Sequence, residues 1–239
     1  MFYGTNITII SISLPVKNTI FFLLAFFISA TIFSGCGSIY SPTLTLPHEP
    51  LSKNEGQITG ALSGLPQNGD HGDLGLTYSG ERQISYAFSD RISVQLKAWS
   101  QLSELYHIHY NGGTSASLTY LLNSKNDNIP LAVIATSSML IDGRNIDANG
   151  GSLHLATWLP EVGIFRPYAA VGLGMMAVNF NTNDWGYGGI MNAGTSIKLS
   201  DNFRANVEVF GILQRYVYYR TITGYLAPSI SLSWHFNNN

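Results

Sequence analysis

The stretch LAPSISLSWHF, residues 226–236, gives the strongest indication of the fold class of this 239-residue chain. Apolar residues occupy every second position from Leu226 to Phe236, and Ala227, three serines and His235 lie between them. Successive side chains of a β-strand point to opposite faces of the sheet, so residues two apart share a face. The stretch therefore predicts a strand with one apolar face and one polar face.

The same alternation recurs from Gln57 onward and is broken by turn-rich stretches, whereas no segment after Cys36 shows a helical period. Several of these segments reach 9–11 residues, the length a tilted transmembrane strand needs. We predict an all-β protein, a closed antiparallel transmembrane β-barrel of about ten strands, with eight as the alternative. The predicted strands span residues 57–65, 73–88, 92–104, 114–122, 131–141, 151–158, 166–179, 189–199, 203–215 and 223–236.

The charged residues favour a barrel in lipid. They make up 11% of the chain, against about a quarter in a soluble domain. Within the predicted strands Lys97, Lys198, Arg204 and Glu208 have the parity opposite to the apolar residues, which places them inside a barrel with a lipid-facing exterior. A soluble antiparallel barrel or sandwich, whose strands alternate equally well, is the alternative.

Composition also excludes several classes of protein. A formal net charge of −2 provides no basic surface for nucleic acid, so we expect no nucleic-acid partner. The single cysteine excludes an internal disulfide framework and a cysteine-rich zinc site. The low charge argues against a coiled coil and against a disordered chain.

Turn positions predict which way the barrel faces. The shortest turns, Ser89-Asp90-Arg91 and Ser200-Asp201-Asn202, fall on the side where the first strand begins. Longer connections near 105–113, 180–188 and 216–222 fall on the other side, as in barrels with short periplasmic turns and long outer loops. We expect aromatic girdles at both ends and an external partner at the aromatic loops. The girdle residues would be Phe88, Phe203, Trp234 and Phe236 on one side and Tyr106, Tyr110, Trp185, Tyr187, Tyr216, Tyr218 and Tyr219 on the other.

The first 35 residues are typical of a targeting signal. Residues 20–33 are almost continuously apolar, Lys17 precedes them, and the run is too short for a typical spanning helix. Residues 33–36, Phe-Ser-Gly-Cys, resemble a bacterial lipoprotein signal, which implies cleavage before Cys36 and lipidation of its thiol. An ordinary signal peptide or a buried segment with a chance cysteine is the alternative. A start at Val16 instead of Met1 would give a leader of conventional length.

These features predict three regions: a lipoprotein signal peptide over 1–35, the lipid-anchored Cys36 with a Pro-rich tether over 36–56, and the barrel over 57–236. The last strand resembles that of small outer-membrane β-barrel proteins of Gram-negative bacteria, through Ile230, Leu232, Trp234 and the terminal aromatic Phe236. The resemblance implies an outer-membrane location, contact with outer-membrane lipid, and recognition of the last strand by the barrel assembly machinery.

Candidate chemistry is limited to a few polar groups. We expect Lys97, Arg204 and Glu208 to form a polar cluster inside the barrel, either as a satisfied interior or as the lining of a narrow pore. His154 and His235 should point inward. His107 and His109 would share a face of a strand and could bind a metal, but no third ligand is apparent. Residues 184–189, DWGYGG, are interpreted as a flexible loop, with sugar or partner contact as the alternative.

The sequence predicts no catalytic residue, cofactor or metal site, since it lacks a GxSxG motif and no spacing singles out a nucleophile. We expect a non-enzymatic outer-membrane lipoprotein, anchored at Cys36, with a structural or interaction role. The alternatives are a small-solute channel, a soluble lipid-anchored barrel that binds a hydrophobic ligand, and an outer-membrane enzyme that modifies lipids.

Overall fold

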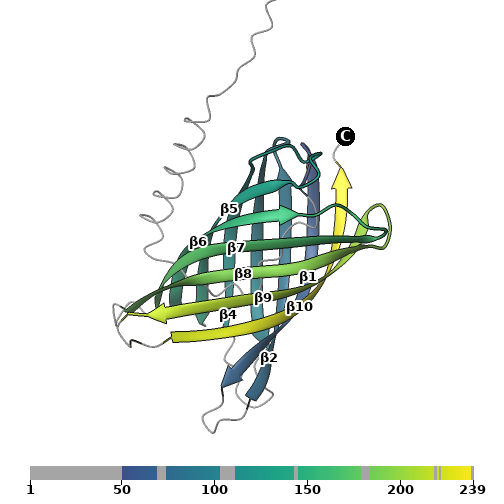
Figure 1. Ribbon diagram of the computed structural model, residues 1–239. Helices are drawn as coiled ribbons and strands as arrows, with labels where there is room; N and C mark the ends of the chain where they lie inside the picture. Colours follow the sequence, from purple (N-terminus) through teal and green to yellow (C-terminus); the bar gives the residue numbers. More distant parts are fainter. Residues whose placement is uncertain are drawn as a thin grey trace, which may run out of the picture.

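The computed structural model describes residues 50–68, 74–102, 111–142, 145–178, 184–217, 220 and 222–237. Within these ranges the chain forms ten strands (Figure 1). Among these residues no helix is long and apolar enough to cross a membrane. The strands are β1 (Glu55–Asn68), β2 (Leu74–Ala87), β3 (Ile92–Leu102), β4 (Asn111–Leu121), β5 (Leu131–Asp142), β6 (Asn145–Trp158), β7 (Phe165–Val178), β8 (Asp184–Lys198), β9 (Phe203–Tyr216) and β10 (Ile222–Asn237).

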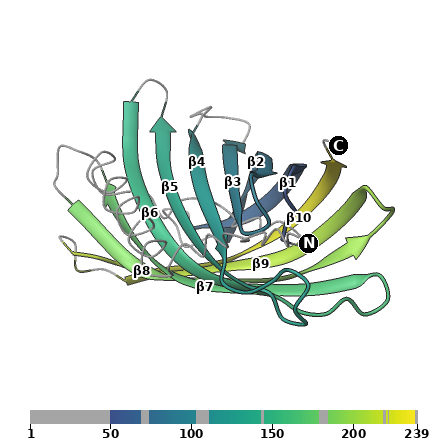
Figure 2. The same ribbon diagram turned by 90° about the horizontal axis from the view of Figure 1, so that it is seen from above.

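The strands close into one antiparallel barrel. Each strand pairs with its neighbours in sequence, and β10 pairs with β1 to complete the ring, from Glu55 opposite Asn237 to Ser63 opposite Ser229. Figure 2 shows β1 and β10 side by side where the ring closes. The predicted fold class is confirmed, with ten strands and not eight. Closure matters because every strand then has a hydrogen-bonding partner on both sides and no sheet edge is left.

At the seam where β10 pairs with β1, the aromatic ring of Phe236 covers Gly56. Gly56 of β1 lies opposite Phe236 of β10, and a Cβ atom added to Gly56 would fall on the Phe236 ring. The terminal aromatic residue of the last strand therefore packs across the first strand. The glycine leaves the space that this packing requires.

The connections differ from the prediction in length. The two tight turns over 89–91 and 200–202 are confirmed by backbone hydrogen bonds such as that from Ser200 N to Phe203 O (3.1 Å). The turns on the side of the tether cover 88–91, 122–130, 159–164 and 199–202, whereas most residues of the connections on the other side lie outside the described residues. Parts of the segments expected as long connections belong to strands, since β4 begins at Asn111, β8 begins at Asp184 and β9 continues to Tyr216.

The clearest such case is the start of β8. Residues 184–189 were interpreted as a flexible loop, but they form the first part of this strand. Trp185 and Tyr187 are exposed on the outer face, and Gly186 and Gly188 alternate with them on the inner face. A Cβ atom on Gly188 would clash with the Leu213 carbonyl and the Gln214 Cα of β9, so the glycines are required for close strand packing. The alternation of glycine and aromatic residue is a strand pattern.

The barrel is apolar outside and largely polar inside. Outward residues such as Leu173, Leu226 and Ile230 are 74%, 61% and 58% exposed. Inward residues of β1–β4 and β10 are mainly serine, threonine and glutamine, and they are buried. The expectation that four strand charges lie on the inner face holds for Lys97, Arg204 and Glu208, which are buried, whereas Lys198 at the end of β8 is only half-buried. Arg82 of β2 and Arg215 of β9, for which no position was predicted, are exposed on the outer face.

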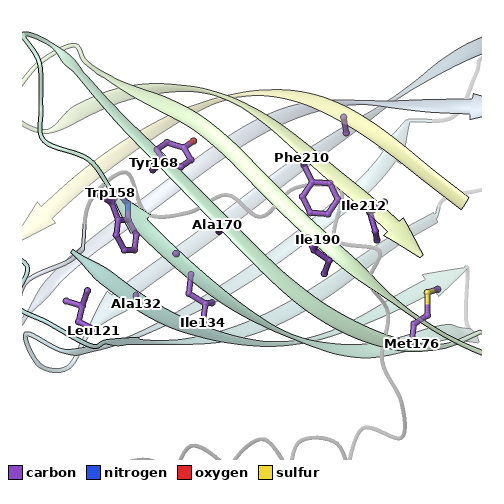
Figure 3. Packing of buried hydrophobic residues seen from close by; sticks show 12 residues of the cluster. Leu121, Ala132, Ile134, Trp158, Tyr168, Ala170, Met176, Ile190, Phe210 and Ile212 are labelled. Atoms are coloured by element: carbon purple, nitrogen blue, oxygen red, sulfur yellow. The ribbon is translucent and has the colours of Figure 1, made fainter. Parts of the chain in front are cut away.

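The interior also holds an apolar cluster, which the sequence analysis did not separate from buried polar residues on the same strands, such as Thr136, His154 and Asn192. Figure 3 shows the side chains of this cluster, which come mainly from β4–β9. This cluster explains why β7 has apolar residues on both faces, because its inner face contacts the cluster and its outer face is exposed. The cluster comprises Leu121, Ala132, Ile134, Ala156, Trp158, Tyr168, Ala170, Met176, Ile190, Phe210, Ile212 and Ala227.

Candidate functional site in the polar barrel interior

The first polar group inside the barrel is an ion pair between neighbouring strands. Lys97 Nζ of β3 lies 3.1 Å from Glu81 Oε2 of β2, and both side chains are almost completely buried. Ser63 of β1 donates a hydrogen bond to the other carboxylate oxygen of Glu81 (2.7 Å). A buried ion pair is stable only when its remaining polar atoms are also satisfied, and Ser63 contributes to this. The pair joins three consecutive strands.

The second group is centred on Glu208 of β9. The Tyr168 hydroxyl of β7 donates a hydrogen bond to Glu208 Oε2 (2.9 Å), across the intervening strand β8. The contact is possible because β8 has Gly194 between them, where a Cβ atom would clash with the Tyr168 ring and Glu208 Cβ. Glu208, Glu81 and Lys97 are all buried on the inner face of the barrel. We call the two groups together the interior cluster (Glu81, Lys97, Tyr168 and Glu208).

The third group lies at the end of the barrel where β1 begins. Arg204 of β9 is buried, and its guanidinium lies 3.1 Å from Glu161 Oε2 in the turn between β6 and β7. Lys198, the last residue of β8, has its Nζ 2.9 Å from Oδ1 of Asp201 in the following turn, and the hydrogen bond from Lys198 lowers the pKa of Asp201. Arg204 therefore ties a turn to the barrel wall.

Pro50 and Leu51 lie at the same end of the barrel. Both residues are buried, and they line one small cavity together with Leu121 and Trp158 of the interior. Pro50 and Leu51, which precede β1, therefore pack against interior side chains of the barrel.

Hydroxyl and amide groups form hydrogen bonds with one another along the seam where β10 pairs with β1. Gln57 donates hydrogen bonds to Thr59 (2.7 Å) and Ser233 (3.0 Å), and Asn206 donates to Ser231 (2.9 Å) and Ser233 (3.1 Å). The network joins β9, β10 and β1 on the inner face. Two acceptors of this network, Gln57 Oε1 and Asn206 Oδ1, are buried without a hydrogen-bond partner among the described residues.

The structure brings together only part of the predicted cluster. Lys97 and Glu208 belong to the interior cluster, whereas the ion-pair partner of Arg204 is Glu161 in a turn. Sequence reasoning missed Glu81, although it has the same inward parity as Ser79 and Gln83. Tyr168 and Glu161 carried no usable signal, because a tyrosine in an apolar run and an acid in a turn have many ordinary explanations.

Other predicted residues fall in different places. His154 is buried inside the barrel as expected, with a ring nitrogen 2.7 Å from the Ser152 hydroxyl, and His235 is half-buried. Cys36, His107 and His109 lie outside the described residues. Within the described part of the chain, no group of three or more His, Cys, Asp or Glu side chains could hold a metal ion.

The aromatic residues partly match the expected girdles. Phe88, Phe203 and Trp234 are exposed at one end, and Trp185 and Tyr187 are exposed at the other with ring centroids 5.9 Å apart. Tyr216 was expected in the outer girdle, but it packs against the apolar cluster inside the barrel, because its parity on β9 is that of Phe210 and Ile212. Tyr106, Tyr110, Tyr218 and Tyr219 lie outside the described residues.

No protein-family model matches the sequence, and a comparison with curated proteins finds no significant match. Among solved structures, the barrel is similar to the outer membrane protease OmpT of Escherichia coli, at 8% identity and a TM-score of 0.45, over 80% of this chain and 100% of that chain. It is also similar to an outer membrane channel of Pseudomonas putida F1 (8% identity, TM-score 0.49, 79% and 98% covered). A third similar structure is the N-terminal β-barrel domain of Pseudomonas aeruginosa OprF (14%, 0.35, 78% and 100%). At these identities and TM-scores the likenesses do not extend to function.

Proposed function

We propose that this chain is an outer-membrane β-barrel lipoprotein of a Gram-negative bacterium with a structural or interaction role. The observation that carries the proposal is the inverted polarity of the barrel. Large apolar side chains such as Leu173, Val171 and Leu213 are more than 60% exposed, whereas Glu81 and Lys97 are buried. In water this arrangement would expose apolar surface and desolvate charges at the same time, and each effect is unfavourable. In a bilayer the exposed side chains face hydrocarbon, and the closed ring leaves no unpaired strand edge.

The packed interior favours a structural or interaction role over a channel. A water-filled lumen leaves the side chains that line it exposed, yet Phe210, Trp158 and Glu208 are at most 2% exposed. The ion pair and the hydrogen bonds of the interior cluster and the seam join polar side chains of several strands inside the described barrel. The interior side chains thus fill the barrel as a core, as expected for a small barrel.

The proposed lipid anchor rests on the sequence around Cys36. Burial of Pro50 and Leu51 at the end where β1 begins supports a short connection between the anchor and the barrel. An acylated Cys36 would then lie in the leaflet on that side of the membrane. We propose this leaflet to be the periplasmic one, since both tight turns lie on the same side.

The test uses the full-length chain expressed in a Gram-negative host. A membrane barrel should resist carbonate extraction and should migrate differently on SDS gels before and after boiling. Migration that boiling does not change, together with release into the soluble fraction when Cys36 is replaced by alanine, would refute the membrane barrel and favour the soluble alternative. Conductance of the purified protein in planar bilayers would refute the non-conducting role, and turnover of labelled lipids would refute the non-enzymatic role.

A further inference from the structure

Arg82 of β2 is exposed on the outer face of the barrel, away from both ends of its strand. Its strand neighbours in register are Gly60 of β1 and Ala98 of β3, neither of which can pair with a guanidinium through its side chain. Among the described residues no side chain forms an ion pair or hydrogen bond with Arg82. A cation on the lipid-facing surface is unfavourable unless an anion accompanies it or it reaches the interface.

Two grooves on the outer surface meet at Arg82. The first, the β1 groove, has a volume of about 870 Å³ and is lined by residues of β9, β10, β1, β2 and β3. The second, the β4 groove, has a volume of about 500 Å³ and is lined by residues of β2, β3, β4 and β5. Arg82 and Ala98 line both. The exposed walls are Leu62, Ile230 and Leu232 in the β1 groove, and Ile84, Leu96 and Met139 in the β4 groove.

The floor of the β1 groove is made by two glycines. A Cβ atom added to Gly60 or Gly80 would meet nothing within 4 Å, so space is open above both. The surface thus offers one unpaired cation between two separate, mainly apolar grooves. A diacyl phospholipid has the complementary composition, with one phosphate and two acyl chains.

We propose that Arg82 and the two grooves form a binding site for one anionic phospholipid, with the phosphate on the guanidinium and an acyl chain in each groove. The inference rests on the proposed membrane location. Arg82 lies nearer to Ala87, the end of β2 on the side of the tether, than to Leu74, so the lipid belongs to the leaflet that holds the proposed anchor. A guanidinium binds phosphate oxygens through two parallel hydrogen bonds, and its long side chain can reach toward the headgroups.

A second copy of the chain fits this surface less well. Face-to-face pairing about a two-fold axis near Arg82 would bring two guanidinium groups together. The middle parts of the described strands carry Glu81 and Glu208 as acids, and both are buried inside the barrel. The middle parts of the described strands of a second copy therefore have no outward carboxylate that could pair with Arg82.

The experiment measures lipid retention by native mass spectrometry. The full-length protein, refolded in dodecyl maltoside, is mixed with equal amounts of dioleoyl phosphatidylglycerol and dioleoyl phosphatidylcholine. We expect one phosphatidylglycerol to remain per barrel, and we expect R82A to weaken its binding at least tenfold, with a smaller loss for R82K. G80L, which places a side chain in the β1 groove at a position where a Cβ atom meets nothing within 4 Å, should also weaken binding about tenfold. The matched controls R215A and G189L change an exposed arginine and an outward glycine away from these grooves, and should bind within twofold of the unmodified protein.

Equal retention by the unmodified protein and R82A would overturn the proposal, as would displacement of the lipid by millimolar inorganic phosphate. Equal retention by G80L would overturn the role of the groove. A photo-crosslinker at Ser100 in intact cells should capture lipid, and capture of a protein that depends on Arg82 would overturn the choice of occupant. If the protein inserts into membranes but shows no preference for phosphatidylglycerol, the lipid site fails and the proposed function stands. If it does not insert, both fail.

Discussion

Replacement of Val171 by arginine tests the inverted polarity of the barrel directly. Val171 lies in the middle of β7 and is 61% exposed on the outer face. Its neighbours in register are Leu155 of β6 and Met191 of β8, which are also exposed and apolar, so no anion is available beside it. An arginine on the lipid face of a barrel costs about 2–4 kcal/mol near the bilayer midplane. We expect V171R to lower the free energy of unfolding by about 3 kcal/mol.

The assay is reversible unfolding by guanidinium chloride in phosphatidylcholine vesicles, followed by tryptophan fluorescence. L199R is the matched control, because Leu199 is 60% exposed but lies in the turn after β8, where the cost falls to about 0–1 kcal/mol. In a soluble barrel the two variants would be alike, each within about 0.5 kcal/mol of the unmodified protein, since both positions are exposed. Equal and small effects in vesicles would refute the membrane assignment.

Further predictions follow from single contacts. K97M should destabilise the barrel by about 3–5 kcal/mol by leaving Glu81 buried without its cation, and adding E81Q should recover much of that loss in the same unfolding assay. G194V should cost about 1–3 kcal/mol, because its side chain would clash with Tyr168, and a T195V control on the outer face should cost less. F236A should slow barrel assembly in cells, measured by the appearance of the heat-modifiable band, and unchanged kinetics would contradict the role of the seam. C36A should abolish incorporation of radiolabelled palmitate, and persistent labelling would contradict the proposed anchor.

Much of the fold was predictable because alternation is a local property. The strand over 223–236 shows this, since the alternation of its apolar and polar residues predicts which side chains share a face. The strand ends were less predictable. Glycine and aromatic residues at 184–189 suit a loop as well as a strand, and the choice depends on how closely β9 approaches Gly188.

The interior cluster was only half predictable. Parity placed Lys97 and Glu208 inside the barrel, but it contains no information about which strands meet across the interior. The contact between Tyr168 and Glu208 depends on Gly194 in the strand between them, and the Arg204 partner lies in a turn. Arg82 was missed because most charged residues in the predicted strands obey the parity rule.

Residue order within short segments was enough to predict the strands, their inner and outer faces and the candidate signal at Cys36. Only the folded barrel shows that the ring closes with ten strands, that an apolar cluster lies among polar residues inside it, and that two grooves meet at Arg82. These features depend on the register between strands, which brings residues far apart in the chain side by side and which no single segment encodes.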